Sequence, residues 1–337
     1  MTTTDCARPG VAIVRSPWTV GWALAWIFTL ACGSALSSRS ATAQGAGTAS
    51  DTGCPLSQPS VPRAVAGVID SETLQLDDGS RVRLIGALGP HAADTGERVD
   101  AWPPQTEAQR VLASLAHGRT VTLAYAGRQR DRHGRYLAHV FIAGGQAGPI
   151  WLQGAMLEAG QARAYGIPDN FACFDALLAA EDRARRQRIG IWTNAAYGVR
   201  SARRSYDLMR LAGTFQIVEG DVVKAARSKS GRLYLNFGGD WRSDFSIVVA
   251  SPLSRSEPAW VASLLDLTGR RVRVRGWIIR RNGPMIEVEH KHQIKILDPG
   301  EDVGSSAKAD SRDAPPDARS APQPSNAAPS SGDAIEQ

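Results

Sequence analysis

Short runs of alternating apolar and polar residues dominate the chain from residue 63 to about residue 142. Three of these runs, "AVAGVID", "TLQLDD" and "RVRLIGAL", are separated by Asp-Ser and Asp-Gly pairs, which favour tight turns between strands. The next segment, residues 106–118, repeats its apolar positions at helical spacing, with Thr106 at a capping position and Gly118 as a stop. Two further strand-like runs follow, and then two helix-like runs at residues 149–160 and 171–190. The pattern predicts three strands, a helix, two strands and then helices.

A second segment, from residue 210 to residue 297, repeats this order with little shared sequence. Its strand-like runs begin with "FQIVEGDVVKAAR", "RLYLNFG" and "DFSIVVA", and a helix-like run follows. The last two strand-like runs meet at Asn282-Gly283, a pair typical of a tight hairpin turn. Three strands, a helix and two strands form the order of a five-stranded barrel of the oligonucleotide- and oligosaccharide-binding type, the OB-fold. We therefore predict a mainly β, α+β fold class, with one OB-fold-type barrel followed by a second, smaller OB-like β-barrel.

The N-terminus has the pattern of a secretory signal peptide. Arg8 and Arg15 precede an apolar run at residues 18–36, and Ala41-Thr42-Ala43 forms a small-x-small cleavage signal before Gln44. An uncleaved membrane anchor is the alternative, because the run is nearly long enough to span a bilayer. A poor lipoprotein signal ending at Cys32 is a further alternative. In each case we expect the protein to act outside the cytoplasm, in the periplasm or as a secreted protein.

The cysteines fit an oxidising compartment. Cys6 and Cys32 lie in the predicted leader, which leaves Cys54 and Cys173 as an even pair. We predict a disulfide between them that ties the N-terminal arm to the domain body, with two unrelated thiols as the alternative. In the chain-entropy model, a bridge that closes so long a loop contributes roughly 3–5 kcal/mol.

The charge is uneven along the chain. The formal net charge of the 337 residues is +6, while the Ser-, Ala-, Pro- and Asp-rich tail is mildly acidic and has the composition of a disordered segment. The remaining part is therefore more basic, which favours polyanionic partners. These patterns divide the chain into a signal peptide (1–43), an N-terminal arm (44–62), a first β domain (63–194), a linker (195–209), a second β domain (210–297) and a disordered tail (298–337).

Two motifs of the first β domain resemble those of a known family. "DRHGRYLAHVF", from Asp131 to Phe141, resembles the second signature of the staphylococcal nuclease-like (thermonuclease) family, with His133 where the family has Tyr. "IDSETLQL" together with "VRLIGALGPH" resembles the first signature. The resemblance covers about residues 65–192. It implies the family's OB-fold barrel and calcium-dependent hydrolysis of phosphodiesters in DNA and RNA.

The residues that the resemblance assigns to phosphate binding are present. Arg83 and Arg135 match the two arginines that brace the phosphate, and Arg132 matches a basic neighbour in the second signature. Tyr165 matches a tyrosine that packs against the nucleotide. The structural alternatives are a strand residue for Arg83, pairing with a nearby Asp for Arg135, and a core or cap aromatic for Tyr165.

The acidic residues of the family's site are mostly absent. Glu72 stands where the first metal-binding Asp would be, Leu88 replaces the second metal-binding Asp, and His91 replaces the Glu that activates water. Calcium requires oxygen ligands, and its affinity follows the number of charged ligands. An imidazole can act as a base near neutral pH, so His91 is a doubtful catalytic candidate beside Arg83 and Arg135. Asp70, Asp94 and Glu97 lie close enough in sequence to replace a lost acid, with solvated turn residues as the alternative.

A basic strand in the second β domain gives a separate indication. Arg271, Arg273 and Arg275 alternate with valines, so their side chains share one face of a strand while the valines face the core. A basic face with nearby aromatics, here Tyr234, Phe237 and Trp241, is typical of proteins that bind single-stranded nucleic acid. A solvated polar face above core aromatics is the alternative.

The sequence thus predicts an exported protein that binds phosphate or nucleic acid, with hydrolysis weak or lost. Single-stranded DNA or RNA is the expected partner, and no cofactor is expected unless calcium serves a site that is still active. One alternative is an active divalent-metal-dependent nuclease that uses Glu72, His91, Arg83 and Arg135, with Glu72 as a weak metal ligand. Another is a cell-envelope module that binds protein or glycan. A membrane partner is expected only if the leader is uncleaved.

Overall fold

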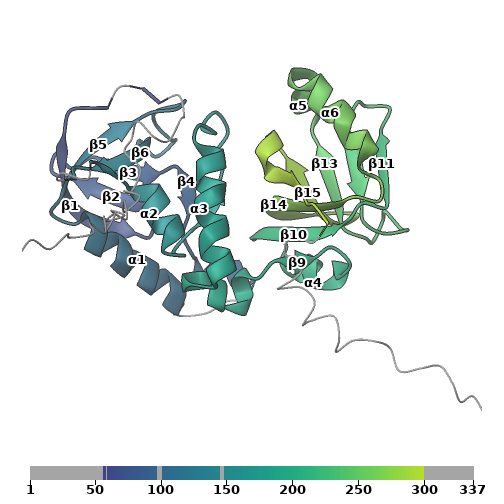
Figure 1. The fold of residues 1–337 in the computed structure, drawn as a ribbon, viewed down its shortest axis with the longest axis horizontal. Coiled ribbons are helices and arrows are strands. Elements are labelled where there is room, and N and C mark those ends of the chain that lie inside the picture. The colour runs from purple at the N-terminus through teal and green to yellow at the C-terminus, as the bar shows by residue number, and fades with distance from the viewer. Residues whose placement is uncertain (1–55, 58, 97–100, 145–147, 300–337) are drawn as a thin grey trace, which may run out of the picture. The chain divides into compact units, whose positions relative to one another are not determined.

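A computed structural model describes residues 56–57, 59–96, 101–144 and 148–299 (Figure 1). The predicted leader, most of the tail, Cys54 and Glu97 lie outside these residues. Among the helices of the described ranges, none is long and apolar enough to cross a membrane.

The first β domain is built on a closed five-stranded barrel. Its sheet has the order β3-β2-β1-β5-β6-β7, and an additional parallel pairing of β3 with β6 closes the first five of these strands into the barrel, while β7 pairs with β6 outside the ring. This barrel confirms the predicted OB-fold type. The alternation of the sequence gives its core: Leu74 and Leu76 of one strand and Val82 and Leu84 of the next are buried. The strands of this domain are β1 (Arg63–Asp70), β2 (Thr73–Leu76), β3 (Arg81–Leu84), β5 (Thr120–Ala124), β6 (Tyr136–Ile142) and β7 (Ile150–Trp151).

Two α-helices pack on strands of this barrel, and a third packs against the second helix and a small separate sheet (Figure 1). The helix predicted to begin at Thr106 begins at Pro103 instead, because proline suits the first turn of a helix, where its missing N–H is not needed. A two-stranded sheet carries the turn in which the first signature ends. The helices are α1 (Pro103–Ala116), α2 (Leu152–Glu158) and α3 (Phe174–Gln187), and the small sheet consists of β4 (Gly86–Leu88) and β8 (Arg163–Tyr165).

The second β domain contains one larger sheet of the order β11-β12-β13-β15-β14-β10-β9. The pairing of β13 with β15 is parallel, as is that of β3 with β6 in the first domain. The hydrogen-bonded path ends at β11 and β9, so the second barrel stays a prediction. The turn predicted at Asn282-Gly283 is present, with Asn282 at a φ of 66°. The strands are β9 (Arg200–Ser201), β10 (Phe215–Asp221), β11 (Lys224–Arg227), β12 (Leu233–Asn236), β13 (Ser246–Val249), β14 (Arg271–Arg281), β15 (Gly283–Val288) and β16 (Ile294–Ile296).

Short helices complete the second β domain and the segment before it. The predicted linker at residues 195–209 contains η3 (Ala195–Tyr197), strand β9 and the start of α4 (Ser205–Arg210). Strand β9 pairs with β10, so this segment is part of the sheet. Helices α5 (Ser251–Ser256) and α6 (Pro258–Ser263) lie between β13 and β14, at the position predicted for a helix.

Candidate functional site

The residues of the first signature meet around the carboxylate of Glu72. Glu72 lies in the turn between β1 and β2, is 5% exposed, and has both oxygen atoms in hydrogen bonds. Its Oε2 accepts a hydrogen bond of 3.1 Å from Nη2 of Arg83 in β3. Its Oε1 accepts one of 2.9 Å from the backbone N–H of Gly89 and lies 2.7 Å from Nε2 of His91. The structure therefore brings together three of the predicted site residues, Glu72, Arg83 and His91, which we call the Glu72 cluster.

Glycine at position 89 allows this turn to approach the Glu72 cluster. A Cβ atom at Gly89 would lie 2.3 Å from Oγ of Ser71, a distance that real side chains do not adopt. The backbone N–H of Gly89 thereby reaches the carboxylate directly. Its hydrogen bond belongs to the charge-assisted class, which is stronger than a bond between neutral groups.

Charge is nearly balanced in the Glu72 cluster, and the balance depends on His91. The hydrogen bond to Glu72 raises the pKa of His91 above its ordinary value of 6.5, although partial burial acts in the opposite direction. When His91 is protonated, the guanidinium and the imidazolium outnumber the one carboxylate, and the cluster carries a net positive charge. In that state the local charge favours an anion over a cation.

The residues at this site do not fit a calcium ion. Leu88 in β4 is 3% exposed and supplies no oxygen ligand. The carboxylate of Glu72 is held by the Arg83 guanidinium, the His91 imidazole and a backbone N–H, so an incoming cation would have to displace its existing partners. Oδ1 of Asp70 accepts a hydrogen bond of 2.7 Å from the backbone N–H of Glu72, and so holds the turn. No group of three or more His, Cys, Asp or Glu side chains suited to a metal occurs within the described ranges.

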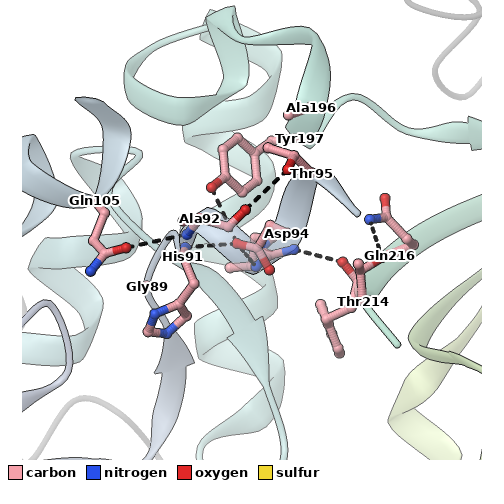
Figure 2. A network of polar contacts seen from close by, with 12 residues as sticks. Gly89, His91, Ala92, Asp94, Thr95, Gln105, Ala196, Tyr197, Thr214 and Gln216 are labelled. Carbon is pink, nitrogen blue, oxygen red and sulfur yellow. Dashed lines mark hydrogen bonds and ion pairs between the residues drawn. The ribbon is translucent and has the colours of Figure 1, made fainter. Parts of the chain in front are cut away.

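Asp94 is buried, and it does not replace a lost metal ligand. It lies in η1 (Ala92–Thr95), where its Oδ2 accepts a hydrogen bond of 2.8 Å from the backbone N–H of His91 (Figure 2). The same oxygen accepts bonds of 2.7 Å from Nη2 of Arg163 and 3.1 Å from the hydroxyl of Tyr197. The sequence alternative of a solvated turn residue is therefore wrong for Asp94: it is the centre of a buried polar network. Burial and the Asp94 charge both raise the pKa of Tyr197.

This network links the signature turn to the second β domain. Arg163 in β8 also donates a hydrogen bond of 2.6 Å from Nη1 to the carbonyl oxygen of Phe215 in β10. Figure 2 shows Tyr197, Thr214 and Gln216 gathered beside the turn that carries His91 and Asp94. Sequence reasoning did not single out Arg163 or Tyr197. One arginine in a short strand gives no signal of burial, since the acids and carbonyls that satisfy it are far away in sequence.

The second signature positions Arg135 beside its own acid. Nε of Arg135 donates a hydrogen bond of 2.7 Å to Oδ2 of Asp131, which is the structural alternative foreseen for this arginine. Arg132 is exposed, and its Nε donates to Nε2 of His133 at 3.1 Å. Arg135 is two residues before Leu137, the residue of β6 that faces Arg83 across the strands. The two phosphate-binding candidates thus lie in β3 and just before its parallel neighbour β6, and each pairs with its own acid, Glu72 for Arg83 and Asp131 for Arg135.

Tyr165 packs against aromatic residues of the second β domain. Its ring meets those of Phe215 and Trp277 edge to face, with centroids 5.4 Å and 6.3 Å away. These contacts match the alternative of a packing aromatic. Tyr165 remains half-buried and lines a small hollow together with Arg275 and Trp277.

The arginine-rich strand has the predicted register, but the expected exposed face is buried. Val272 and Val274 are in the core, as the alternation predicts. Arg273 and Arg275, however, are 2% and 5% exposed. Nη2 of Arg273 lies 2.6 Å from Oε1 of Glu219 in β10, and that of Arg275 lies 2.8 Å from Oε1 of Glu181 in α3.

Because most of the arginine side chains of β14 are buried, little of this face can contact a polyanion. Only Arg271 has a substantially exposed side chain, and its Nη2 also bonds to Glu219, at 3.3 Å. Alternation in the sequence indicates which side chains share a face, but it does not indicate what covers that face. Here α3 of the first β domain covers it and supplies Glu181 as the counter-charge.

Cys173, the residue immediately before α3, is disulfide-bonded. The predicted partner, Cys54, lies outside the described residues, so this pairing stays a prediction.

The barrel is of the OB-fold type, and it carries the two signature motifs. A family model described as staphylococcal nuclease homologue matches residues 81–194. The chain therefore carries a domain of the staphylococcal nuclease-like family, as the two signatures predicted. The match includes Arg83, Leu88, His91, Arg135 and Tyr165, while Glu72 and the second β domain lie outside it. A comparison with curated proteins finds no match to the chain.

Proposed function

We propose that the chain is an exported protein whose nuclease-like domain binds the phosphate backbone of nucleic acid and hydrolyses it weakly or not at all. The observation that carries this proposal is the engagement of both Glu72 oxygens by Arg83, His91 and the Gly89 backbone. A carboxylate so engaged is not a free metal ligand, and Leu88 cannot supply a second one. Export rests on the leader pattern of the sequence alone.

The charge of the Glu72 cluster supports anion binding. The side chains of Arg83 and His91 are 26% and 40% exposed, so both reach solvent while Glu72 remains beneath them. Fixed cationic donors of this kind form strong, charge-assisted hydrogen bonds with phosphate oxygens. Arg132 and Arg135 extend the basic surface along the second signature. Because phosphate binding releases counterions, the affinity should fall steeply as the salt concentration rises.

One observation favours hydrolysis as a second candidate. A carboxylate that holds an imidazole nitrogen can orient the ring and stabilise its protonated form, as in many general-base pairs. Glu72 and His91 have this relationship. In that case Arg83 would stabilise the charge that develops on the phosphate, and the family's metal dependence would be expected.

A cleavage and binding experiment separates these candidates. Fluorescein-labelled single-stranded DNA and RNA twelve-mers are incubated with the purified protein for hours, with calcium, with other divalent ions and with chelator. Affinity is measured by anisotropy across a series of salt concentrations. We expect salt-sensitive binding without cleavage. Metal-dependent cleavage that Arg83→Ala abolishes would overturn the proposal, and the absence of both cleavage and binding would favour the protein- or glycan-binding alternative.

The variant Glu72→Gln sharpens this test. If Glu72 neutralises Arg83, removal of the Glu72 charge should strengthen binding of the twelve-mers. If the protein is a nuclease that uses Glu72, the same change should abolish its activity. Arg110→Ala is the matched control for Arg83→Ala, because Arg110 is an exposed arginine of α1 away from the Glu72 cluster. This control removes the same charge and should leave the affinity within about twofold, since a single distant surface charge is largely screened.

A further inference from the structure

A second hollow lies in the second β domain, away from the Glu72 cluster. Its volume is about 350 Å³, within the usual range of small-molecule sites. It lies over β11, β12, β13 and the turn between β14 and β15. Its lining residues are Ala226, Arg227, Ser228, Tyr234, Asn236, Trp241, Ser246, Arg281, Asn282 and Met285.

The strand register places this hollow on the outer face of the sheet. Asn236 faces Ser246 across one pair of strands, and Ser246 faces Met285 across the next, so the three side chains form a row. Leu233 and Leu235, which alternate with Tyr234 and Asn236, belong to the core on the other face. Side chains of one strand that point to one face recur at every second residue, so the floor of the hollow is fixed by rigid strands.

Trp241 is presented at the rim by a tight loop between β12 and β13. Oδ1 of Asp240 accepts a hydrogen bond from the backbone N–H of Arg242, and Oδ2 of Asp244 accepts one from that of Asp240. Trp241 is nevertheless 49% exposed, with the guanidinium of Arg242 over its ring at 4.4 Å. The loop is thus ordered by its own acids, while the large aromatic side chain faces solvent.

The hairpin turn on the other side of the hollow packs against this loop. A Cβ atom at Gly283 would lie 2.4 Å from the carbonyl oxygen of Asp244, so only glycine allows the close approach. Arg281 and Asn282 precede this glycine and line the hollow. The loop that carries Trp241 and the turn that carries Arg281 are therefore held in a fixed relation before any ligand binds.

The hollow is cationic and has no acidic lining residue. Arg227 and Arg281 are both exposed, and neither forms an ion pair within the residues that the structure describes. Asn236 uses its Oδ1 to accept a hydrogen bond of 3.1 Å from Oγ of Ser246, and both residues line the hollow. An aromatic surface, an amide and two arginines without counter-charges suit a ligand that has both a planar ring and a negative charge.

We propose that this hollow binds one nucleotide of a single-stranded nucleic acid. The base stacks on Trp241 and contacts Tyr234, and Arg227 and Arg281 bind the adjoining phosphate. This inference deepens the proposed function, on which the choice of polymer rests, but it uses residues of a different domain. A neutral glycan would also stack on Trp241, yet it would leave the two arginines without an anion.

The test uses fluorescein-labelled oligothymidylate of ten residues and the purified protein. Stacking of one base on an aromatic side chain contributes about 1–3 kcal/mol, so Trp241→Ala should weaken binding roughly 5- to 150-fold, and Trp241→Phe should retain most of the affinity. Arg281→Ala should weaken binding and lower the slope of log affinity against log salt by about one unit. Arg255→Ala, which removes an exposed arginine of α5 outside the hollow, is the matched control.

The outcomes separate this proposal from that for the first domain. Weakening by Trp241→Ala but not by Arg83→Ala supports the hollow and overturns phosphate binding at the Glu72 cluster. Weakening by Arg83→Ala, with Trp241→Ala within twofold of the original protein, overturns the hollow alone. If the protein does not bind oligothymidylate, both proposals are overturned. Both are also overturned if it binds a neutral hexasaccharide in preference and Trp241→Ala abolishes that binding. Melting temperatures of the variants check that each remains folded.

Discussion

Nε2 of His91 lies 2.7 Å from Oε1 of Glu72. These two residues occupy the positions at which a staphylococcal nuclease-like domain is expected to carry a water-activating acid and a metal-binding acid. In this chain they bind to each other. The replacement of an acid by histidine therefore does more than remove a base, because the imidazole also occupies an oxygen of the remaining carboxylate.

The His91–Glu72 pair predicts a change of stability on the alkaline side of pH 6.5. Because the pKa of His91 is raised in the folded state, its contribution is fully present below its ordinary value of 6.5 and is lost as the pH rises through the folded-state pKa. The free energy of unfolding should therefore decline from about pH 6.5 upward, and His91→Gln should flatten this decline. Urea unfolding between pH 5 and pH 9 measures it. His117→Gln, at an exposed histidine without an ion pair in the described ranges, should leave the profile unchanged.

His139 predicts a loss of stability on the acid side. It is 1% exposed, and burial lowers its pKa to about 4. Nδ1 accepts a hydrogen bond of 3.2 Å from Nε1 of Trp151, which requires the neutral ring. Since the unfolded chain takes up the proton first, the free energy of unfolding should fall by about 3 kcal/mol between pH 6.5 and pH 4. His139→Gln should remove much of this fall.

A second histidine acts in the same direction and needs its own variant. Burial, together with the nearby charge of His292, lowers the pKa of His290 to about 4. Acid unfolding of His290→Gln and of the double variant separates the two contributions. If the free energy of unfolding of the double variant still falls as steeply between pH 6.5 and pH 4, neither His139 nor His290 causes the fall.

The buried ion pair between Arg275 and Glu181 joins the two β domains, and we expect it to couple their unfolding. Glu181 is fully buried, so removal of its partner leaves an uncompensated charge, which typically costs about 3–5 kcal/mol. Arg275→Met should therefore be strongly destabilising, and Glu181→Leu/Arg275→Met should be less destabilising than the sum of the single changes. Chemical unfolding measures the cycle. Arg203→Ala, which removes an exposed ion pair with Asp221, should cost less than about 1 kcal/mol.

The sequence predicts the barrel well because the barrel depends on local pattern. Alternation identifies the strands, and the Asn282-Gly283 turn follows from the same local chemistry. The two signatures also identify Arg83, Arg135 and the acids lost at Leu88 and His91. None of these inferences requires knowledge of residues that are distant in sequence.

The sequence does not predict which polar groups become buried. Arg273 and Arg275 have the alternation of an exposed stripe, but Glu219 and Glu181 allow them to be buried beneath α3. Asp94 has the sequence context of a turn, yet Arg163 and Tyr197 make it the centre of a network. In each case the deciding partner lies more than 50 residues away, and an ion pair at that range leaves no periodic signal.

Calcium binding offers the most direct check that the acids of the site have been lost. Millimolar calcium should leave the melting temperature of the original protein within about 1 °C of its value in chelator, because Leu88 supplies no ligand and Glu72 is already occupied. Leu88→Asp/His91→Glu removes the imidazole that occupies Glu72 and adds two carboxylates beside it. Without calcium this variant should be less stable, since the added charges repel one another in a partly buried turn.

Calcium should then stabilise the variant, because a ligand that binds only the folded state adds about 2.7 kcal/mol at one hundred times its dissociation constant. For a protein of this size the gain corresponds to a rise in melting temperature of roughly 4 °C. Leu88→Asn/His91→Gln is the matched control, since it has similar shapes without the charges and should not respond. If calcium stabilises the original protein as much as the variant, the Glu72 cluster is a metal site after all, and the pairing of Glu72 with His91 must give way when the ion binds.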